Sequence, residues 1–259
     1  MFMSRRAFLV ASGVVPATPL LGQSSGAEVS GVSDVFPSQA PAVVREMVAV
    51  SHGNVVRVRE LLSGRPALAN AAWDWGFGDW ETALGAASHV GNREIADLLL
   101  RAGARPSLFS AAMLGQLEVV RALVAASPGV QKVRGPHGIT LLAHAKSGGA
   151  LEVVKYLESV GGADERYVNE PMDDRERTAV TGVYTFGRGT TDRLVVSVNE
   201  RTGLVIKREG GVERNLFHHG ARVFHPSGAE AVRIRFAEGE PAATVVIEDG
   251  GLVVTGRRR

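Results

Sequence analysis

Apolar residues recur at steps of three and four between residues 41 and 164, and the same arrangement appears four times. In each copy, small residues precede a glycine, and a stretch after the glycine carries its apolar residues on one side, as in Ile95, Leu98 and Leu99. This periodicity predicts an amphipathic helix on either side of each turn. A helix pair of this length cannot bury its apolar side alone, so the pairs are expected to stack. The four turn glycines are Gly53, Gly91, Gly115 and Gly149.

The period changes to two after residue 178. Val232, Ile234 and Phe236 alternate with two arginines, which gives one apolar face and one polar face. Many short strands with close, glycine-rich turns predict a small antiparallel barrel or sandwich. The predicted strands are 182–186, 193–198, 204–208, 215–218, 222–224, 231–236, 244–248 and 252–255.

Residues 1–27 are typical of an export signal. An arginine pair precedes a short apolar run, and this run is too short and too interrupted to span a bilayer, which takes about 20 apolar residues. The segment from Ser4 to Leu9 resembles the twin-arginine signal of bacteria, S-R-R-x-F-L. The resemblance implies twin-arginine translocation and a periplasmic or secreted protein. A terminal helix with a chance arginine pair is the alternative.

Together these patterns predict an α+β protein of two domains. The charged run around Asp173 and Asp174 is interpreted as a solvated linker rather than as a catalytic carboxylate pair. The predicted boundaries are a signal peptide at 1–27, a linker at 28–40, a helical repeat domain at 41–164, a charged linker at 165–178 and an all-β domain at 179–259.

The helical segment resembles the ankyrin repeat family. Residues 82–87, T-A-L-G-A-A, and 140–145, T-L-L-A-H-A, are similar to the signature T-P-L-H-x-A, although neither keeps its proline or its histidine. The glycine spacing is uneven, 38 residues from Gly53 to Gly91 and 24 from Gly91 to Gly115, so the connection before the second repeat must be long. The resemblance implies an ankyrin-type α-solenoid of about four helix-pair repeats, whose concave face binds a partner.

Residues 182–258 resemble the accessory β domain that follows penicillin-binding-protein-like serine hydrolases. The resemblance rests on spaced apolar positions such as Tyr184, Leu194 and Phe224. The resemblance implies a fold but no catalytic residue. The S-x-x-K motif of the parent enzymes is missing, because no serine of the chain is followed three residues later by a lysine.

Charge and cysteine content exclude several classes of function. The chain has 29 basic and 27 acidic residues, and residues 1–27 hold two arginines and no acid, so the remainder balances at 27 against 27. A body without net positive charge is not predicted to bind nucleic acid. With no cysteine, the chain forms no disulfide, no thiolate metal site and no cysteine nucleophile.

The long connection before the second repeat carries all three tryptophans. Residues 73–80 are W-D-W-G-F-G-D-W, and in an extended segment the rings at 73, 75 and 77 point to one side. Large rigid rings dominate protein interfaces, which favours a partner-binding finger. Packing of the rings over the short third repeat is the alternative. The predicted partner-binding residues of this finger are Trp73, Trp75, Phe77 and Trp80.

The resemblance to ankyrin repeats implies further partner-binding positions just before the turn glycines. Met113 and Leu114 are expected to form an exposed apolar pair on the concave face. His52 and His89 are expected to align there, but two histidines without an acid or a cysteine do not predict a metal site. The predicted concave-face residues are His52, His89, Val90, Met113 and Leu114.

Three histidines lie close together in the sequence of the β domain: His218, His219 and His225. Because adjacent residues of a strand point to opposite faces, His218 and His219 cannot bind the same ion. We therefore predict no metal and no cofactor for this chain.

These observations predict an exported, non-catalytic protein that binds a protein or peptide partner, with no nucleic acid and no membrane insertion after signal removal. In a first alternative, the β domain is a hydrolase-accessory domain or binds a small ligand in a lipocalin-like cavity. In a second, the chain is an immunity or regulatory protein for an exported enzyme. The residues expected to line the lipocalin-like cavity are Tyr184, Phe186, Phe224 and Phe236.

Overall fold

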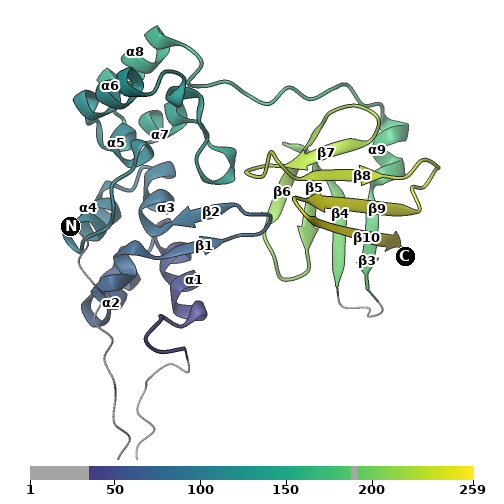
Figure 1. Ribbon diagram of the computed structural model, residues 1–259, viewed down its shortest axis with the longest axis horizontal. Helices are drawn as coiled ribbons and strands as arrows, with labels where there is room; N and C mark the ends of the chain where they lie inside the picture. The colour runs from purple at the N-terminus through teal and green to yellow at the C-terminus, as the bar shows by residue number, and fades with distance from the viewer. Residues whose placement is uncertain (1–34, 188–191) are drawn as a thin grey trace, which may run out of the picture.

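The molecule consists of a helical half and a β-barrel (Figure 1). The computed structural model describes residues 35–187 and 192–259. The predicted signal peptide, 1–27, and most of the predicted linker, 28–40, therefore lie outside the described residues. Among the helices of the described ranges, none has both the length and the apolar character that a bilayer crossing requires.

Helix pairs build the helical half, and the first helix of each pair contacts the first helix of the next pair. Buried leucines, alanines and valines from neighbouring pairs share two apolar cores. The pairs are α1 (Pro41–Val50) with α2 (Val55–Gly64), α3 (Ala83–His89) with α4 (Arg93–Arg101), α5 (Leu108–Leu114) with α6 (Leu117–Ala126), and α7 (Leu141–Ser147) with α8 (Leu151–Val160).

Local sequence explains where these helices begin and turn. Thr82 and Thr140 cap α3 and α7, because their side chains accept hydrogen bonds from the backbone N–H groups of Gly85 and Ala143. Gly91 has a φ of +74°, and a Cβ there would lie 2.1 Å from the carbonyl oxygen of Ser147. Only glycine therefore allows the turn after α3 to lie against the fourth helix pair.

The described residues do not show the predicted ankyrin solenoid. The connections between the helix pairs differ in length and conformation, so the pairs are not copies of one repeat unit. A 3₁₀ turn and a hairpin separate α2 from α3, residues 102–107 separate α4 from α5, and two 3₁₀ turns precede α7. The inserted elements are the 3₁₀ turn Pro66–Asn70, the hairpin strands β1 (Ala72–Asp74) and β2 (Trp80–Thr82), and the 3₁₀ turns Val130–Lys132 and Pro136–Gly138.

Antiparallel strands of residues 182–258 close into an eight-stranded barrel, which confirms the mixed α+β class and the predicted barrel. Alternate side chains point into the interior and form its apolar core, as the period of two requires. Each strand pairs with its neighbour in sequence, and β10 closes the barrel against β3. The strands are β3 (Gly182–Phe186), β4 (Arg193–Asn199), β5 (Gly203–Arg208), β6 (Glu213–His218), β7 (Val223–Pro226), β8 (Arg233–Phe236), β9 (Thr244–Asp249) and β10 (Leu252–Arg258).

The predicted charged linker, 165–178, is not wholly a linker, because it contains most of helix α9 (Asp174–Val180). Asp173 caps this helix by accepting a hydrogen bond from the backbone N–H of Glu176. Val180, at its end, is fully buried in the barrel core. The prediction of a linker fails here because the exposed face of this short helix carries the same charged residues that a solvated linker would.

The β1–β2 hairpin connects the helical half to the barrel. Phe77, at its tip, packs against the apolar core of the barrel. Asp79, two residues later, lies against Gly228 of the barrel, where a Cβ would be 2.8 Å from Oδ1 of Asp79 and 3.0 Å from Cα of His137. The two halves therefore meet at a contact that leaves no room for a side chain at position 228.

Replacing Gly228 with alanine is expected to lower the free energy of unfolding by about 1–3 kcal/mol more than a control glycine substitution, because overpacked contacts cost this much. Gly210→Ala is the control, since Gly210 has the same φ of +75° and a Cβ added there would have no atom within 4 Å. Urea denaturation of both variants measures the difference. Equal losses in the two variants would show that the contact between the halves is not tight.

Candidate functional site

Glu81 lies at the centre of a polar cluster in the helical half, beside the barrel. It is the middle residue of β2, opposite Trp73 of β1, and its side chain is 0% exposed. The indole Nε1 of Trp75 donates a hydrogen bond of 2.7 Å to Oε2 of Glu81. The other carboxylate oxygen, Oε1, faces the remaining members of the cluster.

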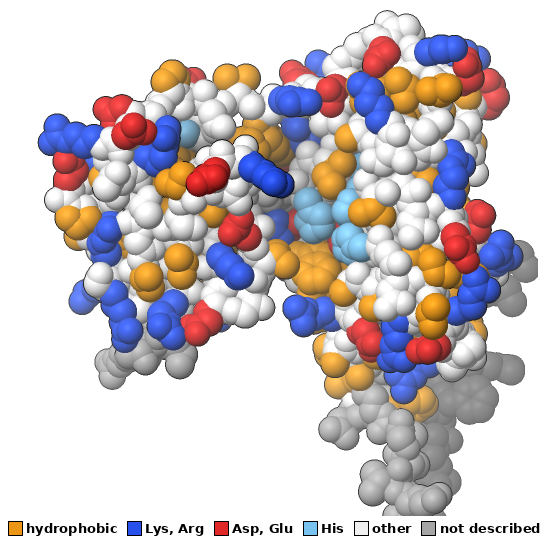
Figure 2. Space-filling model, turned by 180° about the vertical axis from the view of Figure 1, so that it is seen from behind, with side chains coloured by type: hydrophobic (Ala, Val, Ile, Leu, Met, Phe, Trp, Pro, Cys, Tyr) orange, Lys and Arg blue, Asp and Glu red, His pale blue; other side chains and the backbone are white. Residues whose placement is uncertain are grey.

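Three histidines surround Oε1 of Glu81. Their Nε2 atoms lie 2.9 Å (His89), 3.4 Å (His137) and 3.6 Å (His52) from that oxygen. His52 follows α1, His89 ends α3, and His137 lies in the 3₁₀ turn before α7. Stacking of the helix pairs thus brings together residues far apart in sequence, and Figure 2 shows histidines grouped in the hollow between the two halves.

Hydrogen bonds through Nδ1 orient two of these histidines. Nδ1 of His52 lies 3.0 Å from the carbonyl oxygen of Ala49, and Nδ1 of His137 lies 2.7 Å from Oδ2 of Asp79. A carbonyl or an ionised carboxylate only accepts, so both Nδ1 atoms carry a hydrogen and leave Nε2 for Glu81. Histidines held in this way by an oxygen acceptor are typical of metal sites.

Asp79 connects the cluster to the barrel. Its Oδ1 accepts a hydrogen bond of 2.8 Å from the backbone N–H of His137, and its Oδ2 accepts one of 2.6 Å from Nη1 of Arg214 in β6. Both charged side chains are buried. These bonds hold His137 at a φ of +61°, which a residue other than glycine rarely adopts.

The charges in the cluster stabilise one another. Burial alone would raise the pKa of Glu81, but hydrogen bonds with His137 and His89 outweigh it and lower the pKa to about 2. Burial likewise opposes the charge on His137, but its bonds to Asp79 and Glu81 raise its pKa to about 9. At neutral pH and without a metal, Glu81 is therefore ionised and His137 is charged.

A fourth histidine, His144, lies next to this cluster, with its ring centroid 6.3 Å from that of His89. It is fully buried, and neither of its ring nitrogens has a hydrogen-bond partner among the described residues. Burial lowers the pKa of His144 to about 4, so this imidazole is neutral at neutral pH.

The four central side chains are suited to a divalent metal ion. The ligand atoms of His52, Glu81, His89 and His137 all lie within 4.8 Å of one another. Zinc binds imidazole nitrogen and carboxylate oxygen at about 2.0–2.2 Å, so the ligands of a tetrahedral ion are about 3.4 Å apart. The distances from the three Nε2 atoms to Oε1 are close to that separation, and metal binding would release the proton that His137 holds at Nε2.

A cavity of about 270 Å³ opens beside the cluster, between the two halves. The side chains of His52 and His137 are 33% and 29% exposed, so an ion can reach the cluster from this side. The lining residues are His52, Trp75, His137, Val212, Glu213, Arg214 and Ser227.

Comparisons with known proteins do not support the family resemblances. No family model matches the chain, and no curated relative matches it. A search of solved structures returns SurE, with 23% identity, a TM-score of 0.26, and coverage of 45% of this chain and 27% of that chain. The assignment to the ankyrin repeat family is wrong. So is the assignment of the barrel to the accessory domain of penicillin-binding-protein-like hydrolases.

The reason is that the features behind both resemblances are general ones. A threonine such as Thr82 or Thr140 caps a helix in any fold, and the proline and histidine specific to the ankyrin signature are missing. The spaced apolar positions of the β domain are the inward positions that any small barrel requires. The twin-arginine motif lies outside the described residues.

The predicted aromatic finger is a hairpin whose rings do not share one side. Trp73 and Trp75 pack against the helical core, and Trp75 also binds Glu81. Phe77 has a φ of +60° in the turn, which directs the tip to the barrel core. Trp80 is 64% exposed. The tight turn at 76–79 breaks the alternation on which the prediction depended.

The predicted exposed apolar pair on the concave face is not formed. Met113 is 0% exposed, and Leu114 is half-buried against the helical core. Neighbouring helices approach closely here, because a Cβ at Gly148 would lie 2.0 Å from the carbonyl oxygen of Met113. Val90 is exposed, whereas His52 and His89 belong to the cluster around Glu81.

The histidines of the barrel do not form the main histidine cluster. Nε2 of His219 lies 2.7 Å from Nδ1 of His225, whereas His218 bonds to the carbonyl oxygen of Glu170. Sequence reasoning missed Glu81 and His137 as partners of His52 and His89. A usable signal was present, because His52 comes two residues after the first helix of one pair and His89 ends the first helix of the next pair.

Proposed function

We propose that this protein binds a divalent metal ion of the zinc class through His52, Glu81, His89 and His137. The observation that carries the proposal is the convergence of three imidazole Nε2 atoms on one oxygen of a fully buried carboxylate. A hydrogen bond from Trp75 fixes the orientation of Glu81. Hydrogen bonds from His52 to Ala49 and from His137 to Asp79 fix the orientation of these two histidines. Metal sites need such oriented ligands.

The ligand set favours zinc or a similar borderline metal over calcium or magnesium. Imidazole nitrogen suits zinc, copper and nickel, whereas calcium and magnesium require several oxygen ligands. The cluster offers three imidazoles and one carboxylate. Because the chain has no cysteine, thiolates cannot compete for the ion.

Zinc is expected to bind the chelator-treated full chain with a stoichiometry of one, as measured by isothermal titration calorimetry. Glu81→Gln removes the only carboxylate ligand and is expected to lower zinc affinity by roughly 100-fold or more, since even residues that only orient ligands contribute about 10–100-fold. His219→Asn is the control, because it removes an imidazole from the barrel and leaves the cluster intact.

Circular dichroism separates loss of the site from loss of the fold in Glu81→Gln, and His89→Ala provides a second variant of the same cluster. The proposal is contradicted if the wild-type chain binds no zinc. It is also contradicted if folded Glu81→Gln and His89→Ala bind zinc as the wild type does, or if His219→Asn abolishes binding.

Partner binding is a second proposed function. The observation that favours it is the 64% exposure of Trp80, a large aromatic side chain next to the cluster residue Glu81. Exposed aromatic rings are common at the centre of protein interfaces. Export through the twin-arginine pathway also stays a prediction, and the metal proposal does not depend on it.

A further inference from the structure

Part of the barrel interior is packed, and part of it is hollow. Tyr184 and Phe224 each pack against Phe236, with ring centroids 5.5 and 5.6 Å apart, and all three are buried. These rings therefore belong to the packed core and do not line a lipocalin-like cavity. Of the four aromatic residues expected to line one, Phe186 lines the hollow part, beside the β1–β2 hairpin.

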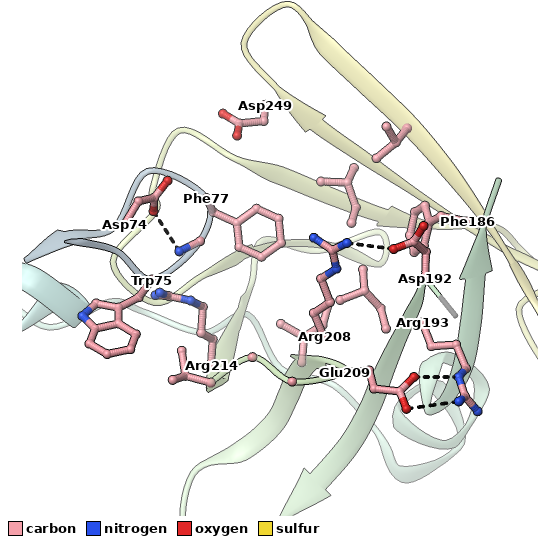
Figure 3. A pocket seen from close by; sticks show the side chains of 18 of the residues that line it. Asp74, Trp75, Phe77, Phe186, Asp192, Arg193, Arg208, Glu209, Arg214 and Asp249 are labelled. Carbon is pink, nitrogen blue, oxygen red and sulfur yellow. Dashed lines mark hydrogen bonds and ion pairs between the residues drawn. The ribbon is translucent and has the colours of Figure 1, made fainter. Parts of the chain in front are cut away.

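The hollow part is a cavity of about 860 Å³ that the β1–β2 hairpin borders. Its volume lies within the range of small-molecule sites, about 300–1,000 Å³. Phe77 projects towards it from the hairpin (Figure 3). An apolar wall of this extent suits a ligand with an apolar body. The wall residues are Phe77, Phe186, Leu194, Ile206, Ile247 and Val254.

The three arginines that line this cavity are already paired with carboxylates. Figure 3 shows two of these pairs at the cavity, and the third is the buried pair that joins the hairpin to the barrel. The arginines therefore offer no unpaired positive charge to an anionic ligand. The pairs are Arg193 with Glu209, Arg208 with Asp192, and Arg214 with Asp79.

Two further carboxylates of the lining, Asp74 and Asp249, have no basic side chain as a partner among the described residues. Asp74 is half-buried in β1, and Asp249 is exposed at the end of β9. The unpaired charge at the cavity is therefore negative. Complementary charge favours a ligand with a cationic head group and disfavours one with an anionic head group.

Asp74 lies beside aromatic rings that also suit a cation. Trp75 and Phe77 follow it in the same hairpin, all three residues line the cavity, and Figure 3 shows them together on its hairpin side. Oδ1 of Asp74 accepts a hydrogen bond of 2.8 Å from the backbone N–H of Gly76, whereas its Oδ2 makes no hydrogen bond within the described ranges. An ammonium group can donate to such an oxygen and is attracted by the face of an aromatic ring.

We propose that the barrel cavity binds an amphiphilic monoamine, with its ammonium group against Asp74 and Phe77 and its apolar body against Phe186 and the barrel wall. This site is distinct from the cluster around Glu81 and does not require a metal ion. The apolar wall provides the affinity for the body of the ligand, and the unpaired carboxylates select the charge of its head group.

Decylamine is the probe, and 1-decanol and decanoate are the neutral and anionic controls of equal chain length. Calorimetry and tryptophan fluorescence, which senses Trp75 at the cavity, are carried out on the chelator-treated full chain. Decylamine is expected to bind saturably at one site, roughly five-fold more tightly than decanol, which is the factor that a partly exposed ion pair contributes. Decanoate is expected to bind more weakly than decanol.

Two variants separate the head-group contact from the cavity. Asp74→Asn keeps an oxygen that accepts from Gly76 but removes the negative charge, so it is expected to lose roughly five-fold in decylamine affinity and to leave decanol affinity unchanged. Asp97→Asn is the matched control, because Asp97 is exposed on α4, outside the cavity lining, and its replacement changes the net charge equally. Val254→Phe narrows the cavity and is expected to weaken both ligands.

Equal affinities for decylamine and decanol would overturn the assignment of the head group. So would an unchanged decylamine affinity in Asp74→Asn, or an equal loss in Asp97→Asn. Absence of saturable decylamine binding in the wild type would overturn the cavity proposal, and so would wild-type affinities in folded Val254→Phe. Leu252→Trp, at an exposed position of the lining, takes the place of Val254→Phe if that variant does not fold. Because zinc is absent from these titrations, the outcome does not depend on the metal site.

Discussion

Replacing Asp79 with alanine is expected to lower the free energy of unfolding by about 3–5 kcal/mol, because it leaves a buried arginine without its counter-charge. Asp79 accepts hydrogen bonds from Nη1 of Arg214 and from both the backbone and the ring of His137. The side chains of Asp79 and Arg214 are 2% and 4% exposed, so water cannot replace these contacts in the folded protein. Urea denaturation followed by circular dichroism measures the loss.

The double variant Asp79→Ala with Arg214→Met tests the physical cause. Removing both members of a buried ion pair often costs much less than removing one, so the double variant is expected to be more stable than Asp79→Ala alone. Asp74→Ala is the matched control, because this hairpin carboxylate accepts only a local bond from the backbone N–H of Gly76. A loss below about 1 kcal/mol in Asp79→Ala would show that the contact between the halves contributes little.

The metal-free protein is expected to be most stable near pH 6.5 and to lose stability on both sides. Glu81 has a folded-state pKa of about 2, below its ordinary 4.5. Its ionised form therefore contributes about 3 kcal/mol to the free energy of unfolding, and this contribution is lost as the pH falls from 4.5 to about 2. His144, with a pKa of about 4, adds an acid loss below pH 6.5, because the unfolded chain takes up the proton first. The stabilisation from His137 is lost as the pH rises from 6.5 through about 9.

Denaturation with urea at several pH values, in the presence of a chelator, gives this profile. His137→Gln is expected to remove most of the alkaline loss, because it removes the group whose pKa is raised. His144→Phe keeps an aromatic ring beside Phe109 and is expected to reduce the loss between pH 6.5 and 4. A profile that is flat from pH 4 to 9 would contradict the assigned charges.

The positions of most elements could be predicted from apolar spacing, but their family could not. The predicted strand 182–186 coincides with β3, in which Tyr184 is buried between partly exposed neighbours. Helix α9 was missed because its charged face has the composition of a linker, although Asp173 and Glu176 have the spacing of a capping box.

The site could be predicted only in part, because its residues come from separate segments. The sequence places His52 and His89 at turn positions, and Asp79 and Glu81 lie two residues apart in the tryptophan-rich hairpin. His137 is 48 residues beyond His89, and no local pattern links it to the others. Arg214 belongs to the other half of the molecule, so only the packing of the barrel on the hairpin brings it to Asp79.

The β1–β2 hairpin places Phe77 against the barrel core and Glu81, four residues later, among the histidines. One short segment therefore carries both a contact with the barrel and a residue of the proposed metal site. An ion held by Glu81 would be expected to tighten the same segment that touches the barrel, because a ligand that binds only the folded state raises its stability.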